Sequence, residues 1–183
     1  TLSGVEDSAR LGIPRAVLSR ELSGEEIREI AERAPIEIET FAHGALCMCY
    51  SGMCEMSAVI GGRSGNRGAC AQPCRLRYGW HGKADANPLS LKDANLAAYA
   101  GEMAEMGVAC LKLEGRMKRP EYVAAVTSIY SALLRERRAP TADEQRKLTL
   151  AFSRGGFTDG YYRGRRGKEM FGMRPENARW PEE

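Results

Sequence analysis

The stretch from Glu39 to Ser57 reads ETFAHGALCMCYSGMCEMS, and the rest of the chain is arranged around it. It leaves a predicted strand and turns at Gly44 into a segment rich in glycine. Five of the six cysteines then follow within 28 residues: Cys47, Cys49, Cys54, Cys70 and Cys74. A hydrophobic core has no reason to collect thiols in a loop, whereas a metal needs several soft ligands that converge. We therefore predict a metal or cluster site.

Short predicted strands alternate with amphipathic helices on both sides of this stretch. Strands are expected at 15–19, 36–41, 76–80 and 108–113, and helices at 5–11, 23–33, 93–106, 120–137 and from 141 onward. Capping boxes begin two helices, with Ser23 and Glu26 at one and Thr141 and Glu144 at the other. Asp93 can cap a third helix, and residues 81–87 are expected to form a turn. Between 44 and 75 we expect only a turn of helix, at 55–60. The order predicts an α/β fold, a parallel sheet with a long cysteine-rich loop insertion.

Polar side chains alternate along two of these strands. In 36–41, Glu39 shares a face with Phe41 and is expected near the carboxyl end of the strand, where ligands bind in α/β folds. In 108–113, Lys112 and Glu114 alternate in the same way. The candidate catalytic residues are Glu39, His43, Lys112, Glu114 and Arg116.

These residues allow two interpretations. The two glutamates can bind a polar substrate or act as acid and base, with Lys112 and Arg116 as partners for an anion. The alternative is a structural ion-pair network. His43 can be a ligand, a proton carrier or a packed ring.

Ten residues of the first stretch match a longer pattern: Glu39, Phe41, Gly44, Ala45, Leu46, Cys47, Gly52, Cys54, Met56 and Ser57. This pattern resembles the signature of the collagenase-like peptidase family U32, and the similarity continues through 15–22, 111–118 and 153–161. The resemblance implies that residues 1–150 form part of a TIM-barrel-like domain and that 151–183 are a tail or the start of a following domain. Three or four strands cannot close a barrel, which needs about eight. We therefore expect an exposed sheet edge, or a partner chain or missing segment that covers it.

Composition restricts the setting of the protein. No apolar run approaches the roughly 20 residues of a membrane span, and no charged-then-apolar leader opens the chain. We expect a cytoplasmic protein without membrane contact, in which reduced cysteines are favoured over a disulfide framework. Because the chain begins at Thr1 rather than Met, we expect a fragment of a longer protein.

The net charge of +3 is unevenly distributed. Up to Leu111 there are 11 Lys and Arg against 14 Asp and Glu, whereas from Lys112 onward there are 16 against 10. A basic second half is compatible with an RNA partner, although a solvated basic face gives the same count. Four arginines around the last two loop cysteines can offset thiolate charge and dock phosphates, or simply be solvated: Arg63, Arg67, Arg75 and Arg77.

The spacing of the cysteines does not decide between zinc and an iron-sulfur cluster. Two tight pairs, Cys49 with Cys54 and Cys70 with Cys74, would suit zinc, whereas wider spacing along a loop suits a 4Fe-4S cluster. The resemblance favours the cluster, because related proteins that hydroxylate RNA bases or the ubiquinone ring hold one on four cysteines. The ligands it implies are Cys47, Cys54, Cys70 and Cys74, with Cys110 and Cys49 in reserve.

The sequence and the resemblance together lead to three candidate functions. The first is oxygen-independent, iron-sulfur-dependent hydroxylation of a base in tRNA or rRNA, with prephenate implied by the resemblance as hydroxyl donor. The second is the proteolysis that the family name indicates, although neither a cysteine–histidine pair nor a His-Glu-x-x-His motif is evident. The third is a non-catalytic metal-binding fragment.

Overall fold

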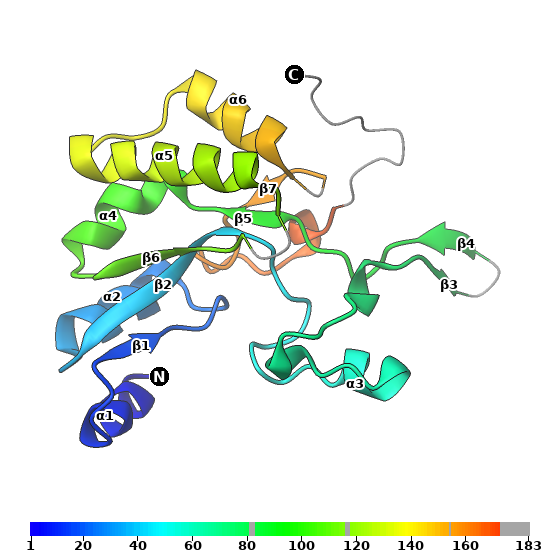
Figure 1. Ribbon diagram of the computed structural model, residues 1–183, viewed down its shortest axis with the longest axis horizontal. Helices are drawn as coiled ribbons and strands as arrows, with labels where there is room; N and C mark the ends of the chain where they lie inside the picture. The colour runs from blue at the N-terminus through cyan, green and yellow to red at the C-terminus, as the bar shows by residue number, and fades with distance from the viewer. Residues whose placement is uncertain (81–82, 116–117, 154, 173–183) are drawn as a thin grey trace.

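A computed structural model describes residues 1–80, 83–115, 118–153 and 155–172 (Figure 1). Its helices are α1 (Leu2–Arg10), α2 (Gly24–Arg33), α3 (Met56–Gly61), α4 (Ala100–Glu105), α5 (Pro120–Glu136) and α6 (Ala142–Ala151). Its strands are β1 (Arg15–Val17), β2 (Glu37–Gly44), β3 (Tyr78–Trp80), β4 (Lys83–Ala86), β5 (Asp93–Asn95), β6 (Cys110–Leu113) and β7 (Phe157–Thr158). Short 3-10 turns lie at η1 (Gly65–Arg67), η2 (Pro73–Arg75), η3 (Ala97–Tyr99) and η4 (Lys168–Met170).

Strand β2 is the hub of a five-stranded sheet. It pairs in parallel with β1 and with β6, and its last two residues pair antiparallel with β5. Strand β5 in turn pairs in parallel with β7. The predicted α/β class and the mostly parallel sheet are therefore confirmed. The sheet is open in the described part of the chain, and the TIM-barrel-like closure stays a prediction.

Local signals in the sequence fix where two helices begin. At α2 the Ser23 hydroxyl accepts from the Glu26 amide at 3.2 Å, and the Ser23 amide donates to the Glu26 carboxylate at 2.7 Å. Thr141 and Glu144 make the same reciprocal pair at α6. Each box satisfies two amides that no helical carbonyl can reach, which confirms both predicted starts.

One face of the sheet carries the core. Ile38 and Ala42 of β2 are 2% and 0% exposed, and they belong to one continuous apolar cluster with residues of α2, α4, α5 and α6. The buried stripe predicted for the long helix α5 is confirmed at Tyr122, Val126, Ile129 and Leu133. The opposite face of β2, with Glu37, Glu39 and Phe41, remains exposed or half-buried.

Two sequence predictions about local structure are wrong. Asp93 does not cap a helix: it is 1% exposed and begins β5, because pairing of the next residues with the end of β2 outweighs its capping preference. The helix starts later, at Ala100, after the 3-10 turn η3. The turn predicted at 81–87 contains β4, which pairs with β3, while residues 81–82 lie outside the described chain.

The cysteine-rich region is spatially distinct. Figure 1 shows α3, β3 and β4 lying apart from the main sheet and from helices α4 to α6. Helix α3 occurs where the turn of helix at 55–60 is predicted. Among the described residues, no helix combines the length and the apolar character needed to cross a membrane.

Core packing gives a first test on helix α6. Leu148 is 0% exposed and Leu150, on the same helix, is 51% exposed. We expect Leu148→Ala to lower the free energy of unfolding by about 2–5 kcal/mol, because it leaves a cavity. Leu150→Ala is the matched control and should change it by no more than about 0.5 kcal/mol. Urea unfolding at neutral pH measures both, and equal losses would contradict this assignment of the core.

Candidate functional site

The cysteine-rich segment begins at a tight backbone contact. Gly44 ends β2 at φ 109°, and a Cβ there would lie 2.6 Å from the carbonyl oxygen of Glu114. Only glycine allows β2 to end this close to the end of β6. The chain then buries Leu46, at 5% exposure, and delivers Cys47 directly after it.

Arg75 ties this segment to the sheet. Its guanidinium donates to the Ser90 hydroxyl at 3.1 Å, to the Leu91 carbonyl at 2.7 Å and to the Leu46 carbonyl. A planar guanidinium with several fixed donors is well suited to connect the segment around Arg75 with the two segments that hold its hydrogen-bond acceptors. Arg75, predicted to dock phosphate, is thus half-buried in a structural role, whereas Arg63, Arg67 and Arg77 are exposed.

Hydrogen bonds within the loop hold its two halves together. The Ala71 amide donates to the buried hydroxyl of Ser57 at 2.9 Å, and the Asn66 amide group donates to the Gly52 carbonyl at 3.0 Å. The Arg63 side chain donates to the Ala69 carbonyl at 2.8 Å. These bonds bring the region around Cys70 back toward the residues that follow Cys47.

Two of the other predicted ligands act on Cys47. Although Cys47 as a residue is exposed, desolvation of its thiol by the surrounding chain raises its pKa; Cys74 and Cys70 raise it further, and the charges on Arg20 and Arg75 oppose the rise. The same Cys47 charge contributes to a raised pKa of Tyr161, whose main cause is burial. Cys47, Cys70 and Cys74 therefore lie in one electrostatic neighbourhood.

The side chains of the four predicted ligand cysteines are chemically suited to bind a metal as thiolates. The backbone amide of Gln72 donates to the Cys70 sulfur at 3.3 Å, with Gln72 held at φ 57°, and amide donors of this kind stabilise sulfur ligands. None of the six cysteines is joined in a disulfide in the structure. In the ranges that the structure describes, no three metal-ligating side chains converge to coordination distance, so the ligand set stays a prediction.

The reserve ligands lie in different places. Cys49 follows Cys47 in the loop, whereas Cys110 is on β6 in register with Glu39. Desolvation, then the charge of Glu39, raises the pKa of Cys110. Cys110 thus belongs to the strand face rather than to the loop.

The predicted carboxylates are held by separate cations. Glu39 accepts from Lys112 at 2.8 Å, with Arg15 at 3.6 Å, and the Lys112 hydrogen bond is the main cause of its lowered pKa. Glu39 is the third residue of the eight-residue strand β2, so its expected position near the carboxyl end is wrong: the strand continues to Gly44. Glu114 follows β6 and pairs with Arg20 at 3.1 Å. Arg116 lies outside the described residues.

Arg20 is a site residue that sequence reasoning missed. Its guanidinium lies 3.8 Å from the centre of the Phe41 ring, and its positive charge also acts on Cys47. Its Nε is buried without a hydrogen-bond partner among the described atoms. Arg20 therefore links the sheet face to the first loop cysteine. Its place just beyond the first strand, at a carboxyl end, is the signal that could have identified it.

His43 is packed in the core. It is 1% exposed, its ring lies 5.2 to 6.2 Å from those of Phe157, Tyr130 and Tyr122, and its Nδ1 is 3.3 Å from the Tyr130 hydroxyl. Burial lowers its pKa to about 4. Three roles were predicted for His43: metal ligand, proton carrier and packed ring. Its surroundings are those of a packed ring.

The buried imidazole gives a second test. An unfolded chain takes up this proton near pH 6.5 and the folded one only near 4, so stability should fall as the pH drops between these values. The loss attributable to His43 is about 3 kcal/mol over the full range. His43→Phe should lack this part of the decline, whereas His81→Gln should retain it. Urea unfolding at pH 7 and 5 measures the difference, and parallel declines in both variants would refute it.

Comparison with known proteins gives a consistent assignment. A tRNA hydroxylation protein P1 of Bacillus subtilis is 43% identical over 135 residues, covering 67% of this chain and 32% of that protein. A 23S rRNA 5-hydroxycytidine C2501 synthase of Escherichia coli is 41% identical, covering 68% and 20%. A protein of Porphyromonas gingivalis named collagenase is 37% identical, covering 82% and 42%.

The chain thus spans between a fifth and less than half the length of these relatives. No solved structure matches it. The sequence profile of peptidase family U32 matches residues 2–172, nearly the whole of the chain. On this evidence, the chain belongs to peptidase family U32.

Proposed function

We propose that this chain is the cluster-binding part of an iron-sulfur-dependent hydroxylase that adds oxygen to a base of tRNA or rRNA without using molecular oxygen. The observation that carries the proposal is the shared electrostatic neighbourhood of Cys47, Cys70 and Cys74, together with the amide donor to the Cys70 sulfur. Relatives named for tRNA hydroxylation and for 5-hydroxycytidine synthesis in rRNA support the choice of reaction.

A 4Fe-4S cluster would be held by Cys47, Cys54, Cys70 and Cys74 and would supply one-electron chemistry when bound. Arg20 and Arg75 would offset the negative charge of the thiolates, because both already act on Cys47. Arg20 would also keep the sheet face in contact with this centre through Glu114 and Phe41. Prephenate, as hydroxyl donor, remains part of the proposal.

Proteolysis is the second candidate, favoured by the relatives named collagenase. A cysteine peptidase needs an imidazole that can take a proton from the thiol. His43 is buried among aromatic rings, with a pKa lowered to about 4, and is poorly suited to that task. Thiols that bind a metal would, in addition, be unavailable as nucleophiles.

Metal loading tests the ligand set. After anaerobic purification we expect about four iron and four sulfide per chain with a broad visible absorbance. Cys47→Ser and Cys70→Ser should lose the iron and the hydroxylation of RNA supplied with prephenate, whereas the matched Cys49→Ser should keep the iron. Mass spectrometry of the digested nucleosides detects the added oxygen atom. One zinc without colour, equal iron in Cys70→Ser, or gelatin cleavage by the metal-free protein would each count against the proposal.

RNA binding tests the role of the exposed arginines. Arg67 is exposed on the loop, and Arg10, whose side chain is 75% exposed on α1, is the matched control. We expect Arg67→Gln to make the dependence of log affinity on log salt shallower by about 0.7, the value for one lost phosphate contact on a single strand. Arg10→Gln should leave the slope unchanged. Filter binding at several salt concentrations measures both, and identical slopes would remove Arg67 from the interface.

A further inference from the structure

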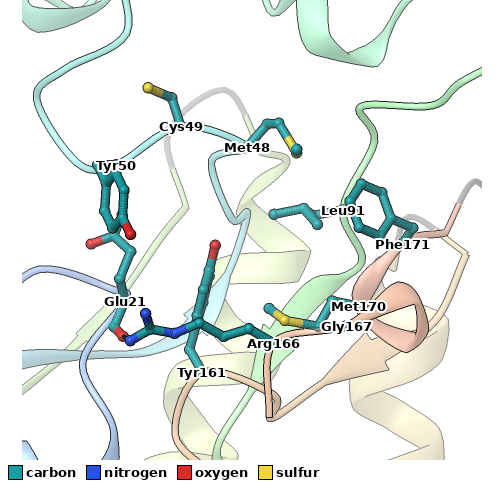
Figure 2. Close-up of a pocket in the computed structure, with 10 residues that line it drawn as sticks. All are labelled: Glu21, Met48, Cys49, Tyr50, Leu91, Tyr161, Arg166, Gly167, Met170 and Phe171. Carbon is teal, nitrogen blue, oxygen red and sulfur yellow. Dashed lines mark hydrogen bonds between the residues drawn. The ribbon is translucent and has the colours of Figure 1, made fainter. Parts of the chain in front are cut away.

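A cleft of about 480 Å³ lies beside the cysteine segment (Figure 2). Three parts of the chain that are distant in sequence form most of it. Its lining residues are Glu21, Met48, Cys49, Tyr50, Leu91, Tyr161, Arg166, Gly167, Met170 and Phe171. Figure 2 shows Tyr161 in the middle, with its hydroxyl pointing toward the loop that carries Met48 and Cys49. Because Met48 directly follows Cys47, a ligand in this cleft would lie next to the proposed cluster.

Specific hydrogen bonds hold the walls of this cleft together. Glu21 is 6% exposed, and its Oε1 accepts from the amide of Ser51 at 2.8 Å and from its hydroxyl at 2.9 Å. Arg166 donates to the Glu21 carbonyl at 3.0 Å. At the start of α2, the Gly24 amide donates to the Tyr162 carbonyl at 2.8 Å. The cleft is therefore a built feature in which residues 160–171 are fastened to the β1–α2 connection.

The lining suits a flat ring. Tyr50, Tyr161 and Phe171 supply aromatic surfaces, and Met48 and Met170 supply polarisable thioethers. Tyr50 is 66% exposed and is available for stacking without any rearrangement of the core. Base–aromatic stacking is the usual way in which proteins hold unpaired bases.

The polar groups suit the edge of a nucleobase. Glu21 is an acceptor and Arg166 a donor, so together they complement a base edge on which an N–H lies beside an acceptor, as on both uracil and cytosine. Their charges balance. A dicarboxylate such as prephenate would need a surplus of cations, which this lining does not provide.

We propose that this cleft receives the target base: an unpaired nucleobase stacks on the exposed ring of Tyr50, with its edge toward Glu21 and Arg166 (Figure 2). The proposal rests on the proposed function, because it makes the cleft the place where an RNA base meets the cysteine centre. A base extruded from its stack would enter from the exposed side, where Tyr50 lies.

Cross-linking tests the placement without depending on activity. Single-stranded oligouridylate carrying 4-thiouridine, irradiated with the anaerobically purified chain, should attach to peptides containing Tyr50 or Tyr161. Tyr50→Ala should weaken oligonucleotide binding about fivefold or more, whereas Tyr50→Phe should bind as the unsubstituted chain does. Val59→Ala, on α3 at 82% exposure and outside the cleft, is the control and should have no effect.

The possible outcomes distinguish failure of the cleft proposal from failure of the proposed function. Hydroxylation of RNA with cross-links elsewhere, and with full binding by Tyr50→Ala, would overturn the cleft and leave the function standing. Cross-links in the cleft without hydroxylation in the presence of prephenate would support the cleft and count against the function. Absence of any RNA cross-link would overturn both proposals.

Discussion

The backbone pairing of strand β2 is the constraint on which the rest of the structure depends. Its first half pairs with β1, its other edge with β6, and its last two residues with β5, so one strand fixes the positions of three others. Its buried side chains anchor helices α2, α4 and α5 in a single core. Its end, at Gly44, is pressed against the backbone of Glu114, which fixes where the cysteine segment leaves the sheet. The position of Cys47 is thus set by the sheet.

The half-exposed face of the sheet is organised by ion pairs that join β1, β2, β6 and the residues just beyond them. Arg15 pairs with Glu37 at 2.7 Å, Lys112 with Glu39 at 2.8 Å, and Arg20 with Glu114 at 3.1 Å. Pairs with this much access to water contribute little to stability, typically about 0–1 kcal/mol each. Their effect is mainly on position: Arg20 is held over the Phe41 ring, and its positive charge also acts on Cys47. The ion-pair network, which was the structural interpretation of the polar strand residues, describes these contacts, and a catalytic role of the glutamates stays a prediction.

Sequence was most informative where the deciding interaction is local. The capping boxes at Ser23 and Thr141 and the buried stripe of α5 depend on residues within a few positions of each other, and the structure agrees with them. The prediction that Asp93 caps a helix failed because β5, which Asp93 begins, pairs with β2, about fifty residues away in sequence. No local pattern carries that information. Arg75 looked like a surface cation until its carbonyl and hydroxyl partners were known. The cleft could not be predicted from the sequence either, because its walls come from segments that are distant along the chain: residues 21, 48–50, 91 and 161–171.

The loop thiols also set a condition on any metal that they bind. Desolvation raises the pKa of Cys47, and the neighbouring Cys74 and Cys70 raise it further. Because a metal binds the deprotonated sulfur, it competes with protons for this site, and its apparent affinity should fall as the solution is acidified. Arg20 and Arg75 work in the opposite direction, because their positive charges stabilise the thiolate. One of these arginines is fixed by Glu114 and the other by backbone carbonyls, so the electrostatic environment of the thiols is built into the fold before any ligand arrives.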